Sequence, residues 1–64
     1  MFTNDNTNGM YSDELLAEMN EALETMLADV DDSFRADAKK NYSDRIMPIA
    51  EEGMTAEQIV AAAR

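Results

Sequence analysis

Apolar residues recur along the first half of the chain with the spacing of an amphipathic helix. They fall three and four positions apart, as the a and d positions of a heptad seam do. The seam comprises Leu16, Met19, Leu23, Met26 and Val30. Ser12 precedes it as a favourable N-cap, and Asp13 and Glu14 place negative charge in the first turn, where the helix dipole favours it. We therefore predict a helix from Asp13 to about Asp31.

The side of this helix opposite the seam is acidic. Its acids are Glu14, Glu18, Glu21, Glu24 and Asp29. The whole chain has 14 acids, five bases and a net charge of −9, and no base occurs in residues 1–32. Residues 33–64 hold five acids and five bases, so the entire excess belongs to the first half. Such segregation is typical of an interaction surface, and the alternative is a solvated helix face that keeps the protein soluble.

A second helix is predicted from about Phe34 to Met47. Its apolar face comprises Phe34, Ala38, Tyr42, Ile46 and Ile49. Proline lacks an N–H and disfavours helical backbone at the preceding residue. Pro48 therefore either ends this helix near Met47 or kinks it and lets it continue to Glu52. Gly53 would end whatever remains, as a C′ glycine does.

Capping signals mark where the later helices start. Asp32 or Ser33 is suited to cap the second helix. The motif Thr55-Ala56-Glu57-Gln58 is a capping box, in which the two end side chains bond to each other's backbone N–H. A third helix is therefore predicted from Ala56 to near the end of the chain. Its buried face comprises Ile59, Val60 and Ala63.

These elements predict an all-α fold, either a small three-helix bundle or a helical hairpin with a short C-terminal helix. Residues 1–11 are rich in Asn, Thr, Asp and Gly, which favour turns. We predict a flexible N-terminal arm there, with Phe2 and Tyr11 as anchors, and a single helical domain over residues 12–64. A chain of this length buries only about 60% of its unfolded surface, and it has no cysteine for a disulfide. We therefore expect self-association to complete the core.

The residue types exclude most catalytic chemistry. Without His or Cys, the chain cannot form a Ser-His-Asp or Cys-His site, nor an ordinary structural zinc site. Asn4, Asn6 and Asn8 have the spacing of the first half of a calcium loop. Such a loop needs Asp at its first position and Glu at its twelfth, where this sequence has Asn4 and Leu15. We therefore predict no enzyme, no metal and no cofactor.

The composition also bears on location and on nucleic acid. The longest apolar run, the five residues Ile59–Ala63, is far shorter than the roughly 20 that span a bilayer. The chain starts without the features of a signal peptide, so we expect a cytoplasmic protein with no membrane partner. The acidic half would repel phosphates, so we expect no direct nucleic-acid binding. A helix-turn-helix is an unfavoured alternative, because Arg64 comes too late in the last helix to read bases.

Two functions fit these features. The first is a small acidic helical module that docks on a larger protein with a basic surface, such as one that binds nucleic acid, and modulates or inhibits it. In size and charge the chain is similar to phage-encoded inhibitors that imitate nucleic-acid charge, a similarity of composition that no motif carries. The second is a homo-oligomer, most simply a dimer, in which the heptad seams of two chains pack together.

Overall fold

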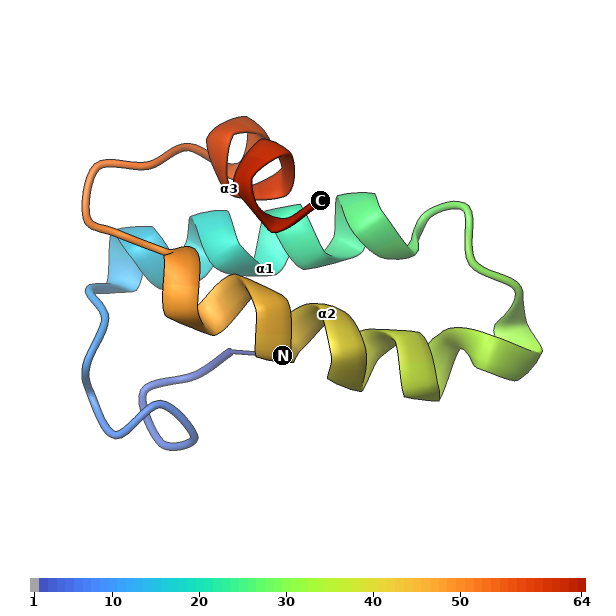
Figure 1. Cartoon of the computed structure of the whole chain (residues 1–64). Coiled ribbons are helices and arrows are strands. Elements are labelled where there is room, and N and C mark those ends of the chain that lie inside the picture. Colours follow the sequence, from blue (N-terminus) through green and yellow to red (C-terminus); the bar gives the residue numbers. More distant parts are fainter. Residues whose placement is uncertain (1) are drawn as a thin grey trace.

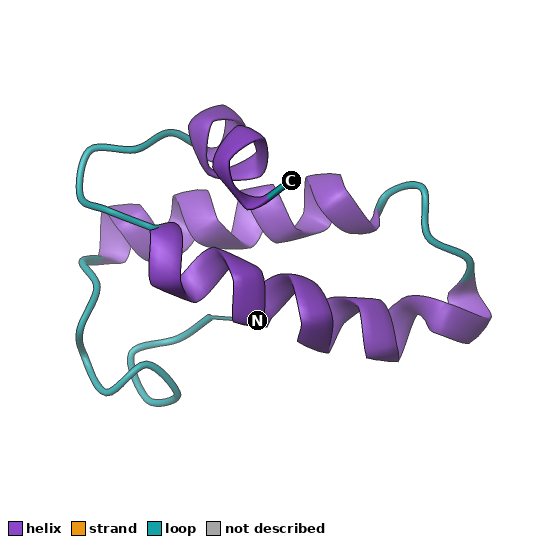
Figure 2. Cartoon of the chain, viewed as in Figure 1, coloured by secondary structure: helices purple, strands orange, loops and turns teal. Residues whose placement is uncertain are grey.

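The computed structural model describes residues 2–64 as three α-helices and one short 3₁₀ turn (Figure 1, Figure 2). The elements are α1 (Asp13–Leu27), η1 (Asp32–Phe34), α2 (Arg35–Ile49) and α3 (Ala56–Ala63). Helices α1 and α2 run side by side in opposite directions, and α3 packs across both (Figure 1). Residues 2–64 contain no strand. The predicted all-α, three-helix fold is confirmed.

The core lies between the three helices and is supplied mainly by α1. The largest fully buried side chains, each less than 2% exposed, are those of Met19, Leu23, Ile46 and Ile59, so every helix contributes at least one. Two more seam residues, Leu16 and Met26, are also buried within this single chain. The apolar stripe of α1 therefore forms the centre of the domain's own core.

Helix α1 ends at Leu27, four residues before the predicted end. The N–H of Ala28 donates to the carbonyl of Thr25 at 3.3 Å, so the last turn tightens to an i→i−3 bond. Three of the five residues that follow Leu27 are acids, and negative charge is unfavourable at the C-terminal end of a helix dipole. Val30, predicted as the last seam residue, consequently lies in the loop and is only half-buried.

Helix α2 begins at Arg35, one residue after the predicted start, but the predicted packing of Phe34 and the predicted cap are wrong. Phe34 belongs to η1 and exposes 64% of its surface, instead of joining the apolar face. Neither Asp32 nor Ser33 caps α2, and Asp32 pairs instead with Arg35 at 3.5 Å. Among the helical elements η1 contacts only α2, so no other helix covers Phe34. The rest of the predicted face, ending with Ile49, packs against the core.

Helix α2 continues through Pro48 and ends at Ile49, two residues beyond the predicted ending near Met47, and it does not continue to Glu52. The N–H of Ala50 still donates to the carbonyl of Ile46 at 3.0 Å, and the backbone then becomes extended. Because Pro48 lies in the last turn, its missing N–H removes a single helical bond. The helix therefore accommodates proline one residue before its end.

The start of α3 has the predicted capping box. Thr55 Oγ1 accepts from the N–H of Gln58 at 3.2 Å, and Gln58 Oε1 accepts from the N–H of Thr55 at 2.9 Å. Gly53 was predicted to be the C′ residue of α2, but α2 already ends at Ile49. Gly53 is instead the third residue of the turn Glu51–Met54 with a φ of +90°, a position that favours glycine. The predicted face of α3 packs on the core through Ile59, Val60 and Ala63.

The N-terminal arm packs against the helices through both predicted anchors. The Phe2 side chain is buried in the core, its N–H donates to Asn20 Oδ1 at 2.7 Å, and its carbonyl accepts from Asn20 Nδ2 at 3.0 Å. The Tyr11 hydroxyl donates to the Met47 carbonyl at 2.8 Å. Met1, the first residue of the predicted arm, lies outside the described residues. Flexibility of the arm stays a prediction, because these contacts describe position and not motion.

The arm also closes on itself in a single turn. Thr3 Oγ1 accepts from the N–H of Asn6, and Asn6 Oδ1 accepts from the N–H of Thr3, which is the pattern of a capping box. Asn8 and Gly9, with φ of 57° and 68°, end the turn. The buried hydroxyl of Thr7 donates to the Thr3 carbonyl at 2.6 Å, so this polar group is satisfied. Asn6, whose spacing resembled a calcium loop, thus helps to hold a turn.

Candidate functional site

The acidic face predicted for the first helix lies on the side of α1 that points away from the core. Glu14, Glu21 and Glu24 are exposed along α1, and Asp29 is exposed just beyond its end. Within residues 2–64, none of these four carboxylates forms a hydrogen bond or an ion pair. They are free to interact with a cationic group from outside the chain.

Glu18, the fifth predicted acidic residue, has a different position. It is half-buried, and its Oε2 accepts from the N–H of Ala56, the first residue of α3, at 3.1 Å. The first N–H groups of a helix have no partner inside the helix, and negative charge is favourable there. Glu18 therefore stabilises the start of the neighbouring helix.

Glu52, which sequence reasoning missed, has the corresponding role at the start of α1. Its two carboxylate oxygens accept from the Ser12 N–H at 3.1 Å and from the Ser12 hydroxyl at 2.8 Å. Ser12 Oγ in turn accepts from the N–H of Leu15, as the predicted N-cap should. Glu52 and Ser12 are 40 residues apart, and no local pattern relates them. Each of the two helix starts is thus held by a carboxylate from another part of the chain.

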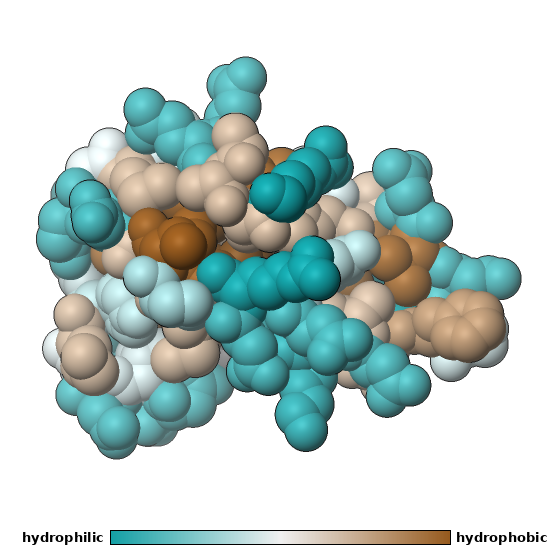
Figure 3. Space-filling view, viewed as in Figure 1, coloured by the Kyte–Doolittle hydropathy of each residue, from teal (hydrophilic) through white to brown (hydrophobic). Residues whose placement is uncertain are grey.

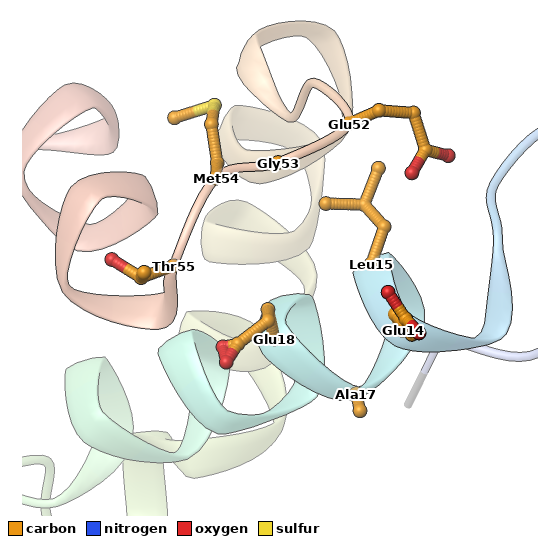
Figure 4. Close-up of a pocket in the computed structure, with 8 residues that line it drawn as sticks. All are labelled: Glu14, Leu15, Ala17, Glu18, Glu52, Gly53, Met54 and Thr55. Atoms are coloured by element: carbon orange, nitrogen blue, oxygen red, sulfur yellow. The ribbon is translucent and has the colours of Figure 1, made fainter.

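An open groove of about 420 Å³ lies between these two helix starts (Figure 4). Side chains from α1 form one side, and the loop that leads into α3 forms the other. In Figure 4 the Leu15 side chain points from α1 toward this loop, and Glu18 reaches toward the beginning of α3. The groove is lined by Glu14, Leu15, Ala17, Glu18, Glu52, Gly53, Met54 and Thr55.

The bases lie on other elements than α1. All five are exposed: Arg35, Lys39, Lys40, Arg45 and Arg64. Four of these bases belong to α2. In the view of Figure 3, α2 lies at the front, and hydrophilic side chains cover much of the surface there. In the part of the chain that the structure describes, the single ion pair joins Arg35 to Asp32. The structure therefore keeps the acidic surface of α1 unneutralised.

The seam predicted for self-association or for the core is occupied within one chain. Leu16, Met19, Leu23 and Met26 are buried there, so seam-to-seam pairing of two chains would have to open this packing. A homodimer through the seam stays a prediction. The large apolar side chains that are exposed are Met10, at 76%, and Phe34.

A stability measurement tests the role of Glu18. Glu18→Ala removes the acceptor at the start of α3, and we expect it to lower the free energy of unfolding by about 1 kcal/mol, as loss of a cap does. Urea denaturation followed by circular dichroism gives this value. Glu21→Ala, an exposed change on the same helix, is the control and is expected to change stability by less than about 0.5 kcal/mol. Equal effects of the two variants would show that the contact with Ala56 contributes nothing.

The arrangement offers negative charge to a cationic partner. No group of three or more His, Cys, Asp or Glu residues in 2–64 is placed to hold a metal ion. No helix in the same range has the length and hydropathy needed to cross a membrane. The exposed carboxylates of α1 create a field that attracts positively charged groups.

No protein-family model, curated protein or solved structure matches this chain.

Proposed function

We propose that this chain is a non-enzymatic protein-binding module that docks through the outer face of α1 on a basic surface of a larger protein. The observation that carries the proposal is the set of four exposed carboxylates without a partner in residues 2–64. They are Glu14, Glu21, Glu24 and Asp29. Complementary charge speeds association and fixes the orientation of the two proteins. Docking would modulate or inhibit the partner by covering that surface.

The distribution of charge favours a basic protein over nucleic acid as the partner. Phosphate groups are bound by clustered Lys and Arg, whereas α1 carries no base. The start of α3 exposes Glu57 and Gln58, and Arg64 follows only after its end. A basic surface that serves nucleic acid is the natural complement of α1. The cytoplasmic location expected from the sequence belongs to this proposal.

An exposed aromatic side chain is available to add affinity. Phe34 lies in η1, five residues after Asp29, and exposes most of its ring. Aromatic residues that become buried at an interface often supply much of its binding energy, while surrounding charges steer the approach. The proposal therefore includes burial of Phe34 against the partner.

The experiment compares two variants of equal charge. The first neutralises the outer face of α1 with Glu21→Gln, Glu24→Gln and Asp29→Asn, and leaves Glu14 and Glu18 unchanged. The control neutralises three exposed acids elsewhere, at Asp5, Asp44 and Glu51. Proteins captured by the immobilised wild-type chain are purified, and their association rates with each variant are measured over a range of salt concentrations.

We expect the outer-face variant to associate about tenfold more slowly at low salt and with a flatter salt dependence, because steering by complementary charge raises association rates by about 10-fold or more. The control variant should behave like the wild type. Equal slowing by both variants would show that only net charge matters. Unchanged rates for the outer-face variant would overturn docking through α1.

A further inference from the structure

We infer that the groove between the starts of α1 and α3 receives an arginine side chain of the partner protein. The inference rests on the proposed function and adds to it the place where one basic side chain is held. An arginine has a hydrocarbon stem and a cationic head, and the groove offers a matching surface to each of these parts.

The apolar part of the groove suits the stem. Ala17 and Met54 supply its accessible hydrocarbon surface, and Gly53 adds no side chain to fill it. Leu15 also lines the groove but exposes only 3% of its surface. A Cβ built at Gly53 would meet no atom within 4 Å, so the space beside this residue is open. The volume of about 420 Å³ is at the lower end of the roughly 300–1,000 Å³ of pockets that hold small ligands. Long basic side chains lay their stems on such surfaces and keep the charge in a polar environment.

The charges around the groove suit the cationic head. Glu14, Glu18 and Glu52 line it, and no base of the chain does. Each of the two helix starts contributes about half a positive charge, so the three carboxylates leave roughly two negative charges. Glu14 has no partner within residues 2–64. Glu18 and Glu52 already accept N–H or O–H bonds, but a carboxylate has about four acceptor sites and can take more.

A long side chain fits this groove better than a compact metal ion does. No three acidic residues in the described part of the chain gather as metal ligands. A metal ion would also make no use of the apolar surface of Ala17 and Met54. Arginine uses both surfaces, and its planar guanidinium can donate to more than one carboxylate.

The test is a titration of the isotopically labelled full chain with N-acetyl-arginine amide, followed by NMR. We expect saturable shifts of backbone amides that are largest in residues 14–18 and 52–56. The neutral analogue N-acetyl-citrulline amide should produce no such pattern. Glu14→Gln should weaken arginine binding about twofold to fivefold, the effect of losing one exposed ion pair. Glu21→Gln, an exposed change on the same helix outside the groove, is the matched control and should leave the affinity unchanged.

Two results would overturn the groove as an arginine site. One is shifts that spread evenly along the acids of α1, and the other is an equal loss of affinity in Glu14→Gln and Glu21→Gln. The captured partner separates this inference from the proposed function. If partner binding is slowed by the outer-face variant but unaffected by Glu14→Gln, the groove is overturned and the docking surface stands. If partner binding is unaffected by either variant, the proposed function itself fails.

Discussion

Replacing Leu23 with aspartate is expected to leave the chain unfolded at 25 °C. Leu23 lies in the middle of α1 and exposes only 1% of its surface. Removing a buried leucine costs about 2–5 kcal/mol, and burial of an unpaired carboxylate costs several kcal/mol more. A domain of 64 residues has a total stability of about 3–10 kcal/mol at the usual 0.05–0.15 kcal/mol per residue. The substitution therefore removes most or all of the available stability.

Far-UV circular dichroism measures this outcome directly as loss of the helical signal. The control is Glu24→Asp, which places the same side chain at the neighbouring, exposed position of α1. It is expected to remain folded, because the difference in helix propensity between these residues is only a few tenths of a kcal/mol. A Leu23→Asp variant with wild-type helicity and a cooperative unfolding transition would contradict the placement of Leu23 in the core.

Replacing Ile59 with alanine is expected to cause the second-largest loss, about 3 kcal/mol. Ile59 has no exposed surface and belongs to α3, which is only eight residues long. A helix this short is unstable alone in water, so it depends on its packing and on its caps. The loss of the isoleucine side chain also leaves a cavity between α3 and the other two helices.

Urea denaturation gives the size of this effect. With a slope of about 1 kcal/mol per molar urea, typical of a small domain, the midpoint of Ile59→Ala should fall by about 3 M or disappear. Ile59→Val removes one methylene, and its expected cost of about 1 kcal/mol keeps the comparison measurable if the alanine variant does not fold. Midpoints equal to that of the wild type in both variants would show that α3 is not packed through Ile59.

Structural features that depend on neighbouring residues were predictable from the sequence. Ser12 begins α1, and the capping box of Thr55 and Gln58 begins α3 at the predicted residue. Both signals act over three residues. The equally local signal of Asp32 and Ser33 failed, because these residues form a 3₁₀ turn in which Asp32 pairs with Arg35. The periodic stripe of α1 likewise identified residues that need a partner surface, but not whether α2 and α3 or a second chain supplies it.

Features that depend on contacts between distant residues were not predictable. Glu18 looked like one more solvated acid on α1, and its contact with Ala56 appears only when α3 is placed beside it. Glu52 and Ser12 meet for the same reason. Phe34 was misassigned because helical periodicity was extended into a segment that forms a 3₁₀ turn. In the candidate site, the sequence thus identified the acids but not which of them are used internally.

The contact of Tyr11 with α2 has an optical consequence. The chain contains two tyrosines and no tryptophan, so tyrosine emission is not lost by energy transfer to an indole. The Tyr11 hydroxyl bonds to a carbonyl 36 residues away, and a hydrogen bond of this kind changes the emission of a phenol. The Tyr11→Phe variant emits only through Tyr42, so subtracting its spectrum from that of the wild type leaves the emission of Tyr11. That emission therefore reports whether the N-terminal segment is docked. The protein thus carries its own spectroscopic probe of this contact, without an added dye.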